Sequence, residues 1–284
     1  MMRLAIFVAL ALYVSHSSAL NIGAFNIQAF GDTKINNAQV ASVLMKILPR
    51  YDIVLIQEVR DADLSAVKIL MNKLNCLGSG EVFSYVVSDQ LGRDTYKERY
   101  LFVYRNDHVA VLDSYHYHDH NMYTQEDTFS REPFVVLVRS LNTDIPDFAL
   151  VPLHSAPKDA VCEIDALYDV YEDVIQKFET NNIIFLGDFN ADCSYVKSAD
   201  WSKIRLRNDE QLSWLIPDSI DTTAGNTDCA YDRIVVSGEE LQCTIKPNSA
   251  KVFNFQNEYG LTLEEALAVS DHYPVEVVLE DPVV

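Results

Sequence analysis

The stretch 182–192, NIIFLGDFNAD, constrains this chain more than any other. Its apolar run 183–186 predicts a buried strand, because the run is rich in strand-forming residues and too short for a helix. Gly187 ends the run, and Asp188 and Asn190 follow two positions apart, so their side chains point the same way in an extended segment. Their oxygens suit a hard divalent cation. A polar turn capping a buried strand would carry the same residues, so both interpretations stay open.

The N-terminal residues have the pattern of a secretory signal peptide. Arg3 precedes the apolar run 4–14, and small residues follow up to Ala19. The run is shorter than the roughly 20 apolar residues that a membrane-spanning helix needs. We therefore expect residues 1–19 to be a signal peptide cleaved near Ala19, and the protein to be secreted without membrane association. Residues 20–284 contain no Pro/Gly/Ser-rich linker and no repeat, so we expect a single domain.

The chain is strongly acidic, with 42 acidic and 22 basic residues and a formal net charge of −20. Such a surface repels polyanions, which argues against DNA binding through bulk electrostatic attraction. A phosphate substrate would need a local basic patch and bound cations. The five cysteines include no C-x-x-C pair, so a structural zinc site is not expected. In a secreted protein they are disulfide candidates, and their odd number leaves at least one unpaired.

Strand-like runs alternate with amphipathic segments along the chain. The clearest helical pattern is 160–178, where apolar residues recur at three- and four-residue steps. This mixed alternation predicts a layered α/β protein, and the number of strands favours two sheets over one parallel wound sheet. The predicted helices are 40–48, 64–74 and 160–178, and the predicted strands are 20–25, 53–58, 100–104, 134–138, 148–153, 183–186, 233–236 and 274–279.

Polar side chains gather where the predicted strands end. Asn26 follows the first strand, Glu58 closes the second, and His154 lies at the end of the run 148–153. Asp188 follows the central strand, and His272 shortly precedes the last one. Each residue alone would be an ordinary strand cap. Together they indicate a site at one edge of an α/β scaffold.

Motifs spread over the whole chain resemble the deoxyribonuclease I family. They are YDIVLIQEVRD (51–61), YKERYLF (96–102), FSREP (129–133), LHSAP (153–157), GDFNADCSYV (187–196), CAYDRIVV (229–236) and SDHYPVEV (270–277). The motifs GDFN and SDH alone specify only the wider endonuclease/exonuclease/phosphatase superfamily. The resemblance implies an α/β (α+β) four-layer sandwich, with two mostly antiparallel central sheets packed face to face and helices outside. It makes residues 20–284 one catalytic domain.

By this resemblance the chain is a secreted, divalent-metal-dependent endonuclease that hydrolyses double-stranded DNA to 5′-phosphate oligonucleotides. Histidine titrates near neutral pH, so His154 and His272 are the natural proton-transfer pair for this chemistry. Each needs a carboxylate to hold its ring. The resemblance assigns Glu98 to His154 and Asp232 to His272.

The resemblance also implies bound Mg²⁺ (or Mn²⁺) and Ca²⁺. Glu58 is assigned to the catalytic cation, with Asn26, Asp188, Asn190 and Asp271 nearby. The implied structural calcium ligands are Asp119, Asp127, the Phe129 carbonyl and Glu132 in one loop, and Asp221, Thr223 and Thr227 in another.

Three residues are implied as DNA contacts, namely Arg60, Tyr96 and Arg131. Arginine binds phosphate bidentately, and tyrosine can stack on a sugar or enter a minor groove.

Cys193 and Cys229 match the family's structural disulfide. Asn121 and Thr124 stand where a second, small disulfide is common, so that bridge is not expected. For the other cysteines, Cys76, Cys162 and Cys243, buried thiols and a further bridge both stay open.

Two alternatives to the nuclease remain. A phosphodiesterase acting on another substrate, such as a phospholipid, is disfavoured by YKERY and the cysteine pair. A non-catalytic actin-binding module is suggested by residues 85–87, which resemble the actin-contacting strand of some family members. Asp63, however, replaces the histidine found there. The presence of both histidines, both carboxylates and Glu58 favours catalysis over a purely binding role. We expect a monomer that acts on double-stranded DNA, and binding of monomeric actin stays open.

Overall fold

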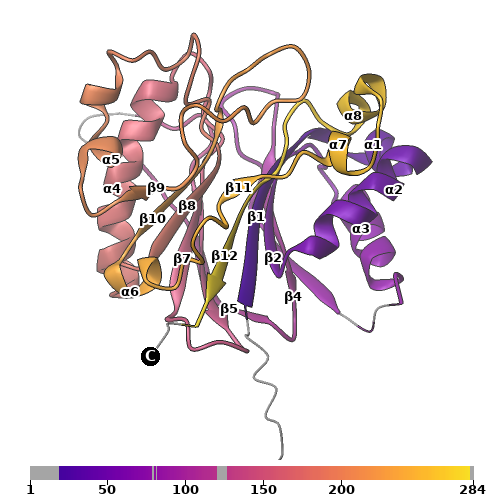
Figure 1. Cartoon of the computed structure of the whole chain (residues 1–284), viewed down its shortest axis with the longest axis horizontal. Coiled ribbons are helices and arrows are strands. Elements are labelled where there is room, and N and C mark those ends of the chain that lie inside the picture. The colour runs from indigo at the N-terminus through magenta and orange to yellow at the C-terminus, as the bar shows by residue number, and fades with distance from the viewer. Residues whose placement is uncertain (1–18, 79, 81, 120–126, 282–284) are drawn as a thin grey trace, which may run out of the picture.

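The computed structural model describes residues 19–78, 80, 82–119 and 127–281 (Figure 1). Within these residues the strands form two six-stranded sheets, packed face to face between two outer layers of helices. The predicted four-layer architecture is therefore confirmed. Most of the expected signal peptide, and also His120, Asn121 and Thr124, lie outside the described residues.

The first sheet has the strand order β11-β12-β1-β2-β4-β3. Strands β1 and β2 are parallel, and the other neighbours in this sheet are antiparallel. The bounds are β1 Ala19–Phe30, β2 Ile53–Val59, β3 Phe83–Val87, β4 Arg99–Arg105, β11 Lys251–Val252 and β12 Val275–Glu280.

The second sheet repeats this plan in the order β5-β6-β7-β8-β10-β9. Here β7 and β8 form the parallel pair, and the other neighbours are antiparallel. The bounds are β5 Val109–His116, β6 Phe134–Ser140, β7 Phe148–Pro152, β8 Ile183–Asp188, β9 Ser213–Trp214 and β10 Asp232–Ser237.

The core between the sheets is apolar and is built from alternate residues of both. Phe102 and Leu55 of the first sheet pack in one cluster with Phe148, Leu150 and Ile184 of the second. Because side chains alternate across a strand, the remaining strand residues face outward and pack against helices. The two sheets therefore meet through a dry, close-packed seam, where a shift of one sheet is resisted by interlocking side chains.

Helices cover the outer face of each sheet (Figure 1). The amphipathic pattern 160–178 forms one uninterrupted helix, and its buried residues face the second sheet. Over the first sheet lie α1 Asp32–Asn36, α2 Ala38–Ile47, α3 Ser65–Asn75, α7 Phe255–Glu258 and α8 Leu263–Val269. Over the second lie α4 Ala160–Phe178 and α5 Arg205–Asn208. The remaining helical turns are η1 Leu48–Arg50, η2 Trp201–Lys203 and α6 Glu239–Gln242.

Strands β3, β5, β9 and β11 were absent from the predicted strands. Each is an edge strand, and β5 alternates only weakly between buried and exposed residues. His116 closes β5, and its Nε2 accepts a hydrogen bond from the Asp89 amide at 3.1 Å. No helix in the described part of the chain is both long and apolar enough for a membrane span.

Candidate active site

The site lies where the two parallel strand pairs end. In β1 and β2 the register is interrupted beyond Asn26 and Ile56, and each irregularity turns side chains out of the ladder. Ala29, Glu58 and Asn190 adopt left-handed backbone conformations, with φ of 54°, 57° and 50°. Non-glycine residues in this region cost of the order of 1 kcal/mol or more each, and such strain collects at functional sites. The strand ends are therefore shaped to present side chains.

The first histidine of the site, His154, follows β7 and is held by a carboxylate from the other sheet. Its Nδ1 lies 2.8 Å from Oε2 of Glu98, which immediately precedes β4. Arg131 donates from Nε to the His154 carbonyl at 2.8 Å, and its Nη1 lies 3.4 Å from Glu98 Oε1. Burial opposes ionisation of Glu98, but the charge and hydrogen bond of His154, with the charge of Arg131, outweigh it and lower the Glu98 pKa.

The second histidine, His272, precedes β12 and pairs with Asp232, the first residue of β10. Nδ1 of His272 lies 2.8 Å from Asp232 Oδ2, which also accepts the Thr222 hydroxyl at 2.8 Å. Burial alone would lower the His272 pKa, yet the surrounding charges of Asp232, Asp188 and Asp271 raise it to about 10. Burial also raises the pKa of Asp232. The pair therefore keeps its shared proton to a higher pH than either group would alone.

Both histidines turn their other ring nitrogen toward one carboxylate. Nε2 of His154 lies 3.7 Å, and Nε2 of His272 lies 3.5 Å, from Oδ2 of Asp188 at the end of β8. Since each Nδ1 is engaged by its own carboxylate, each Nε2 is the nitrogen left to face a substrate. The His154 and His272 pairs each join one residue from either sheet. The site is thus assembled across the seam.

Carboxylate oxygens around Asp188 form a donor set suited to a hard cation. Asn26 Nδ2 donates to Glu58 Oε1 at 3.1 Å and to Asp188 Oδ2 at 3.2 Å, so it brings these two carboxylates together. Asp271 Oδ1 is buried without a hydrogen-bond partner among the described residues, which leaves an unsatisfied acceptor at the site. Asn190 uses Nδ2 for the Ser155 carbonyl at 3.0 Å. These residues fit a hard divalent cation.

The three expected DNA contacts differ in accessibility. The guanidinium of Arg60 lies over the exposed Tyr96 ring, 4.0 Å from its centroid. The Tyr96 hydroxyl is 3.5 Å from Glu58 Oε2, and burial with the charge of Glu58 raises its pKa to about 12. The Arg131 side chain is only 12% exposed, because it is engaged by Glu98 and the His154 carbonyl. Arg60 and Tyr96 therefore form the open surface beside Glu58.

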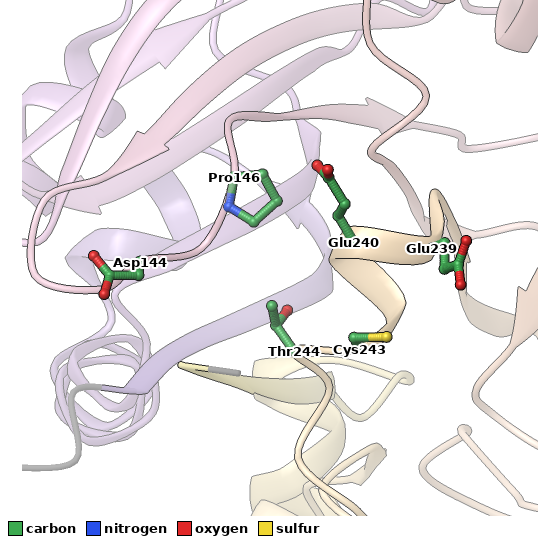
Figure 2. A pocket seen from close by; sticks show the side chains of 6 residues that line it. All are labelled: Asp144, Pro146, Glu239, Glu240, Cys243 and Thr244. Atoms are coloured by element: carbon green, nitrogen blue, oxygen red, sulfur yellow. The ribbon is translucent and has the colours of Figure 1, made fainter. Parts of the chain in front are cut away.

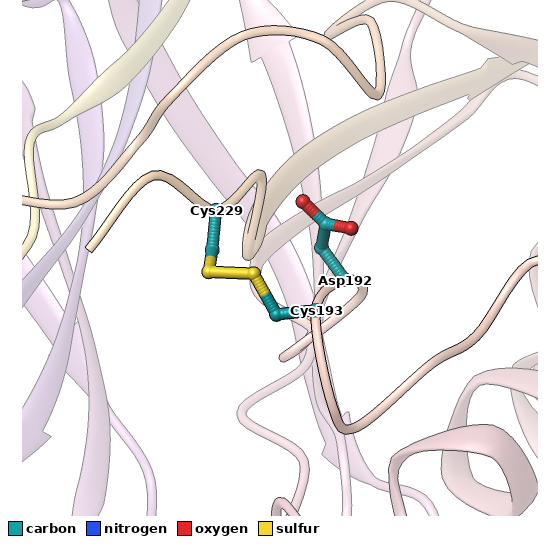
Figure 3. Close-up of side chains that lie close together, drawn as sticks. All are labelled: Asp192, Cys193 and Cys229. Atoms are coloured by element: carbon teal, nitrogen blue, oxygen red, sulfur yellow. A yellow bond between two sulfur atoms is a disulfide. The ribbon is translucent and has the colours of Figure 1, made fainter.

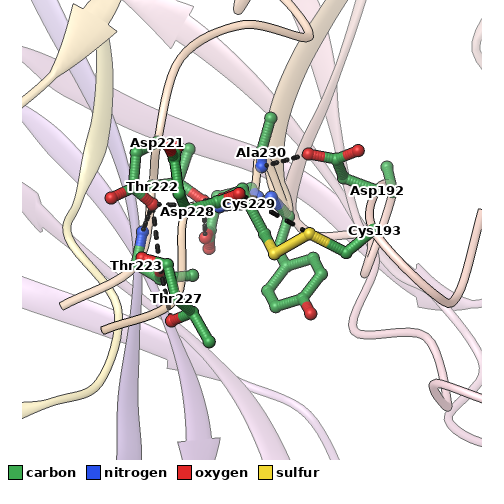
Figure 4. Close-up of a disulfide and its surroundings, with 12 residues drawn as sticks. Asp192, Cys193, Asp221, Thr222, Thr223, Thr227, Asp228, Cys229 and Ala230 are labelled. Carbon is green, nitrogen blue, oxygen red and sulfur yellow. Dashed lines mark hydrogen bonds between the residues drawn. A yellow bond between two sulfur atoms is a disulfide. The ribbon is translucent and has the colours of Figure 1, made fainter. Parts of the chain in front are cut away.

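Two oxygen-rich loops lie at the positions expected for calcium. Oδ1 of Asp221 accepts hydrogen bonds from the Thr223 amide and hydroxyl at 2.9 and 2.7 Å, and the Thr227 carbonyl lies 3.0 Å from the Thr223 hydroxyl (Figure 4). In the other loop, carboxylate oxygens of Asp119, Asp127 and Glu132 lie within 4.8 Å of one another. Both donor sets suit Ca²⁺.

Two of the three carboxylates in the Asp119 loop already have partners within the protein. Asp119 Oδ2 accepts the Thr128 and Phe129 amides at 2.6 and 3.0 Å, and Asp127 pairs with Arg93 at 3.2 Å. Phe129 itself is buried, so its ring anchors this loop in the core beneath α4.

A disulfide joins Cys193 to Cys229, as expected (Figure 3). It connects the loop after β8 to the segment entering β10 at Asp232. Beside it, Asp192 Oδ2 accepts the Ala230 amide at 2.8 Å (Figure 4). The covalent bond and this hydrogen bond together fix the Asp232 strand relative to the Asp188 loop.

Comparison with known proteins places these features in a family. The family model for the Endonuclease/Exonuclease/phosphatase family matches residues 23–272. The chain belongs to the endonuclease/exonuclease/phosphatase family. Within this family, the chain is 57% identical over 267 residues to "Deoxyribonuclease-1-like 2" of Mus musculus, and the match covers 94% of each chain. It is also 57% identical over 261 residues to "Deoxyribonuclease-1" of Bos taurus, covering 92% of both.

A solved endonuclease/exonuclease/phosphatase from Bacteroides vulgatus superposes with a TM-score of 0.63 at 16% identity. The match covers 93% of this chain and 99% of that one. At this identity the likeness shows the fold of the endonuclease/exonuclease/phosphatase family.

The other cysteines of this family member are solvent-exposed thiols, so neither a buried thiol nor a further bridge is found for Cys76, Cys162 or Cys243. Cys243 lines a pocket of about 550 Å³ together with Asp144, Pro146, Glu239, Glu240 and Thr244 (Figure 2). This pocket lies beyond Ser237, at the end of β10 remote from Asp232. It is separate from the histidine site. Around that site, two open hollows of about 210 and 200 Å³ lie beside Arg60 and Tyr96.

Sequence reasoning missed the residues that orient the histidine–carboxylate pairs. Thr222 holds Asp232, and the Ser270 hydroxyl donates to the Asn26 carbonyl at 2.6 Å. The ring of Tyr231 stacks on the ring of the exposed Tyr195, with 5.4 Å between the ring centroids. Its centroid lies 6.3 Å from that of the His272 ring. Tyr195 and Tyr231 lie within the quoted motifs, but nothing in their spacing shows which side of the site they would flank.

Proposed function

We propose that this chain is a secreted, divalent-metal-dependent endonuclease that hydrolyses double-stranded DNA to products with 5′-phosphate ends. One observation carries the proposal. Two histidines, each held at Nδ1 by its own carboxylate, present Nε2 within 3.7 Å of a single oxygen of Asp188. The relatives named deoxyribonuclease support DNA as the substrate.

The two histidines supply the proton transfers. Hydrolysis of a phosphodiester needs one group that takes a proton from the attacking water and another that protonates the leaving oxygen. Glu98 and Asp232 fix the Nδ1–H tautomers of His154 and His272 and stabilise the protonated rings. A phosphate between the two Nε2 atoms would then meet one imidazole on its attacking side and the other on its leaving side.

Glu58, Asp188 and Asp271 would hold Mg²⁺ or Mn²⁺, with the side-chain oxygen Oδ1 of Asn190 as a further ligand, because its Nδ2 is already bonded to the Ser155 carbonyl. When bound, such a cation polarises a phosphoryl oxygen and stabilises charge that develops at phosphorus. Asn26 orients two of these carboxylates through its single amide group. The calcium-type loops would hold Ca²⁺ in a structural role.

Substrate binding is local on an otherwise acidic molecule. Arg60 and Tyr96 lie next to Glu58 and are exposed, so they can contact a phosphate and its sugar outside the reacting group. The two hollows beside them, of about 210 and 200 Å³, are smaller than a typical small-molecule pocket. Hollows of this size suit a long polymer lying across the surface.

Two observations support secretion. Residues 1–19 have the pattern of a signal peptide. The disulfide Cys193–Cys229 is of a kind that persists in oxidising compartments such as the extracellular space. We expect the protein to act as a monomer. For monomeric actin, the expected contact 85–87 lies on β3, an edge strand of the first sheet. Adding monomeric actin to the nuclease assay below decides whether this edge binds it.

The test is nicking of supercoiled plasmid by the purified mature protein with Mg²⁺ and Ca²⁺. We expect nicked circles, their loss in chelator, and their loss with His154→Ala. Glu58→Gln should lower the rate far more than it lowers the melting temperature, because Glu58 is a half-buried side chain at the site. Unchanged Glu58→Gln activity at saturating Mg²⁺ would remove the assigned cation site. No nicking by folded wild-type protein would refute the nuclease and bring forward another phosphodiester substrate.

A further inference from the structure

One buried amide side chain crosses the seam between the two sheets at the site. Gln57 lies on β2 of the first sheet and its side chain has no solvent exposure. Its Nε2 donates to the Leu153 carbonyl at 2.6 Å, and its Oε1 accepts the Asp188 amide at 2.8 Å. Both partners belong to the second sheet's strand ends. A single carboxamide therefore contacts the residue before His154 and the backbone of Asp188.

The surrounding backbone is shaped to admit this amide. Gly187 has a φ of 124°, and a Cβ atom there would lie 2.5 Å from Gln57 Nε2 and 2.6 Å from the Leu153 carbonyl oxygen. Only glycine accepts both this conformation and this close approach. The Gly of the GDFN motif thus has a second use besides ending the strand, because it leaves the space that Gln57 occupies.

Gln57 is also tied to the cation ligands of its own sheet. It is directly followed by Glu58 and pairs in register with Asn26 on β1. On the first sheet it is therefore rigidly connected to Asn26 and Glu58, and on the second sheet it is bonded to the backbone beside His154 and at Asp188. Two further buried hydrogen bonds cross between the sheets at this end, from Asn26 Nδ2 to Asp188 Oδ2 at 3.2 Å and from the His154 amide to the Tyr100 hydroxyl at 2.9 Å. The cluster that fills the rest of the seam is apolar.

We propose that Gln57 is a positioning residue that sets the register of the two sheets at the active site. The inference rests on the proposed function. Its two hydrogen bonds hold His154 and Asp188 of the second sheet at a fixed offset from Glu58 and Asn26 of the first. Apolar packing is non-directional, whereas a buried amide must satisfy both its groups or leave Leu153 and Asp188 unpaired. Gln57 touches no reacting atom and acts only through the residues it holds.

The proposal predicts different effects of losing the Gln57 amide on turnover and on substrate binding. A displacement of about 1 Å between catalytic groups can cost about 100-fold in rate. Arg60 and Tyr96, which contact substrate on the outer surface, are not bonded to the Gln57 side chain. Loss of the amide should therefore lower kcat and leave KM for DNA nearly unchanged.

The first variant is Gln57→Met, which keeps the length of the side chain and removes both hydrogen bonds. We expect kcat in the plasmid assay to fall about 100-fold and KM to change less than about threefold. The matched control is Thr244→Val, which removes a buried hydroxyl bonded to the Leu241 carbonyl at 2.7 Å, at the opposite end of the sheets. It should lower the melting temperature without lowering kcat.

The outcomes separate this inference from the proposed function. If wild-type protein nicks DNA and His154→Ala does not, but Gln57→Met keeps kcat within threefold, the positioning role is wrong. A fall in kcat with Thr244→Val equal to that with Gln57→Met would equally overturn it, because the loss would then reflect stability. Wild-type protein that does not nick DNA contradicts the proposed function itself.

A second variant and a second measurement keep the proposal testable if Gln57→Met folds poorly. Gln57→Glu keeps an acceptor for the Asp188 amide and loses the donor to Leu153, so kcat should still fall at least tenfold. In either variant the ring NMR signals of His154 and His272 should shift, while those of the remote His108 should not. Site-histidine signals that match the wild type would overturn the inference without any activity measurement.

Discussion

The two histidine–carboxylate pairs have the same geometry and different surroundings. In each, Nδ1 lies 2.8 Å from a carboxylate oxygen contributed by the opposite sheet. The His154 pair has a cationic neighbour, Arg131, whereas the His272 pair is surrounded by further carboxylates and a threonine hydroxyl. The first environment favours an ionised Glu98, and the second favours a proton on the pair. Similar geometry thus supports two different electrostatic states within one site.

A third pair, remote from the site, shows what geometry alone provides. His108 Nδ1 lies 2.7 Å from Oδ1 of Asp52, at the start of β2. Asp52 also accepts the Asn21 amide and pairs with Arg105. His108 Nε2 also faces a carboxylate, Asp107 Oδ2 at 3.8 Å, but the Asp107 side chain is 62% exposed, whereas Asp188 is buried and faces two histidine rings. A short histidine–carboxylate contact therefore holds structure together at one end of the sheets, and only at the other end is it combined with convergent groups.

The largest expected effect distinguishes the two site histidines from the remote His108. His154→Ala and His272→Ala should each lower kcat for plasmid nicking by about 1,000-fold, as removal of a proton-transfer group does. The double variant should be little worse, because the groups act as a unit. His108→Ala should stay within about twofold. A similar loss in all three variants would show that the site pairs have no special role.

The carboxylates come next. Glu98→Gln and Asp232→Asn keep the size of each side chain and remove its charge, so we expect losses of about 10- to 100-fold, as is typical when a carboxylate that orients a histidine is replaced. The NMR titration of His272 should also move, because Asp232→Asn removes a charge that raises its pKa. If the pKa of His272 stayed as high in Asp232→Asn as in the wild type, the assigned cause would be wrong.

The disulfide distinguishes the two site pairs, because it joins the loop after Asp188 to the segment that enters the Asp232 strand and does not join the segment that carries Glu98. Its cysteines are 36 residues apart, and the chain-entropy model gives about 4 kcal/mol of stability for such a loop. Cys193→Ser with Cys229→Ser should lower the free energy of unfolding by about that amount in a chemical denaturation series. The ring signals of His272 should shift more than those of His154. Cys243→Ser, at an exposed thiol, is the control.

The smallest effect concerns a buried carboxylate that lacks a histidine. Glu163 on α4 is fully buried, accepts the Ala156 amide at 3.0 Å, and has its pKa raised by burial. A carboxyl whose folded pKa is raised destabilises the protein above that pKa, and the penalty disappears below the ordinary value near 4.5. Glu163→Gln should therefore be more stable than the wild type at pH 7 and not at pH 4. Greater stability of the wild type at pH 7 would contradict this.

Much of the fold could be predicted because it depends on local patterns. The period of apolar residues placed the helix 160–178 at its observed bounds, since one face of α4 lies on the second sheet. The run 183–186 was extended in the structure only by Gly187 and Asp188. The edge strands β3 and β5 were missed because they do not alternate strictly between buried and exposed residues, and β9 and β11 were missed because each has only two residues.

The site was predictable in its residue types and not in its assembly. Polar residues at strand ends indicated where chemistry gathers, and family resemblance supplied the pairing of histidines with carboxylates. No periodicity shows that Gln57 reaches the Leu153 carbonyl, because these residues lie on different sheets and far apart in the chain. Likewise, the burial of Arg131 follows from its contacts with Glu98 and the His154 carbonyl, which only the tertiary structure shows.

That both pairs draw one partner from each sheet makes the active site sensitive to sliding of one sheet over the other. A slip of one sheet by even an ångström would separate His154 from Glu98 and His272 from Asp232 together, while leaving the strands and helices intact. Catalysis should therefore be a more sensitive gauge of interlayer shear than circular dichroism is. Under mild denaturant or hydrostatic pressure, nicking should cease while the secondary structure is still complete.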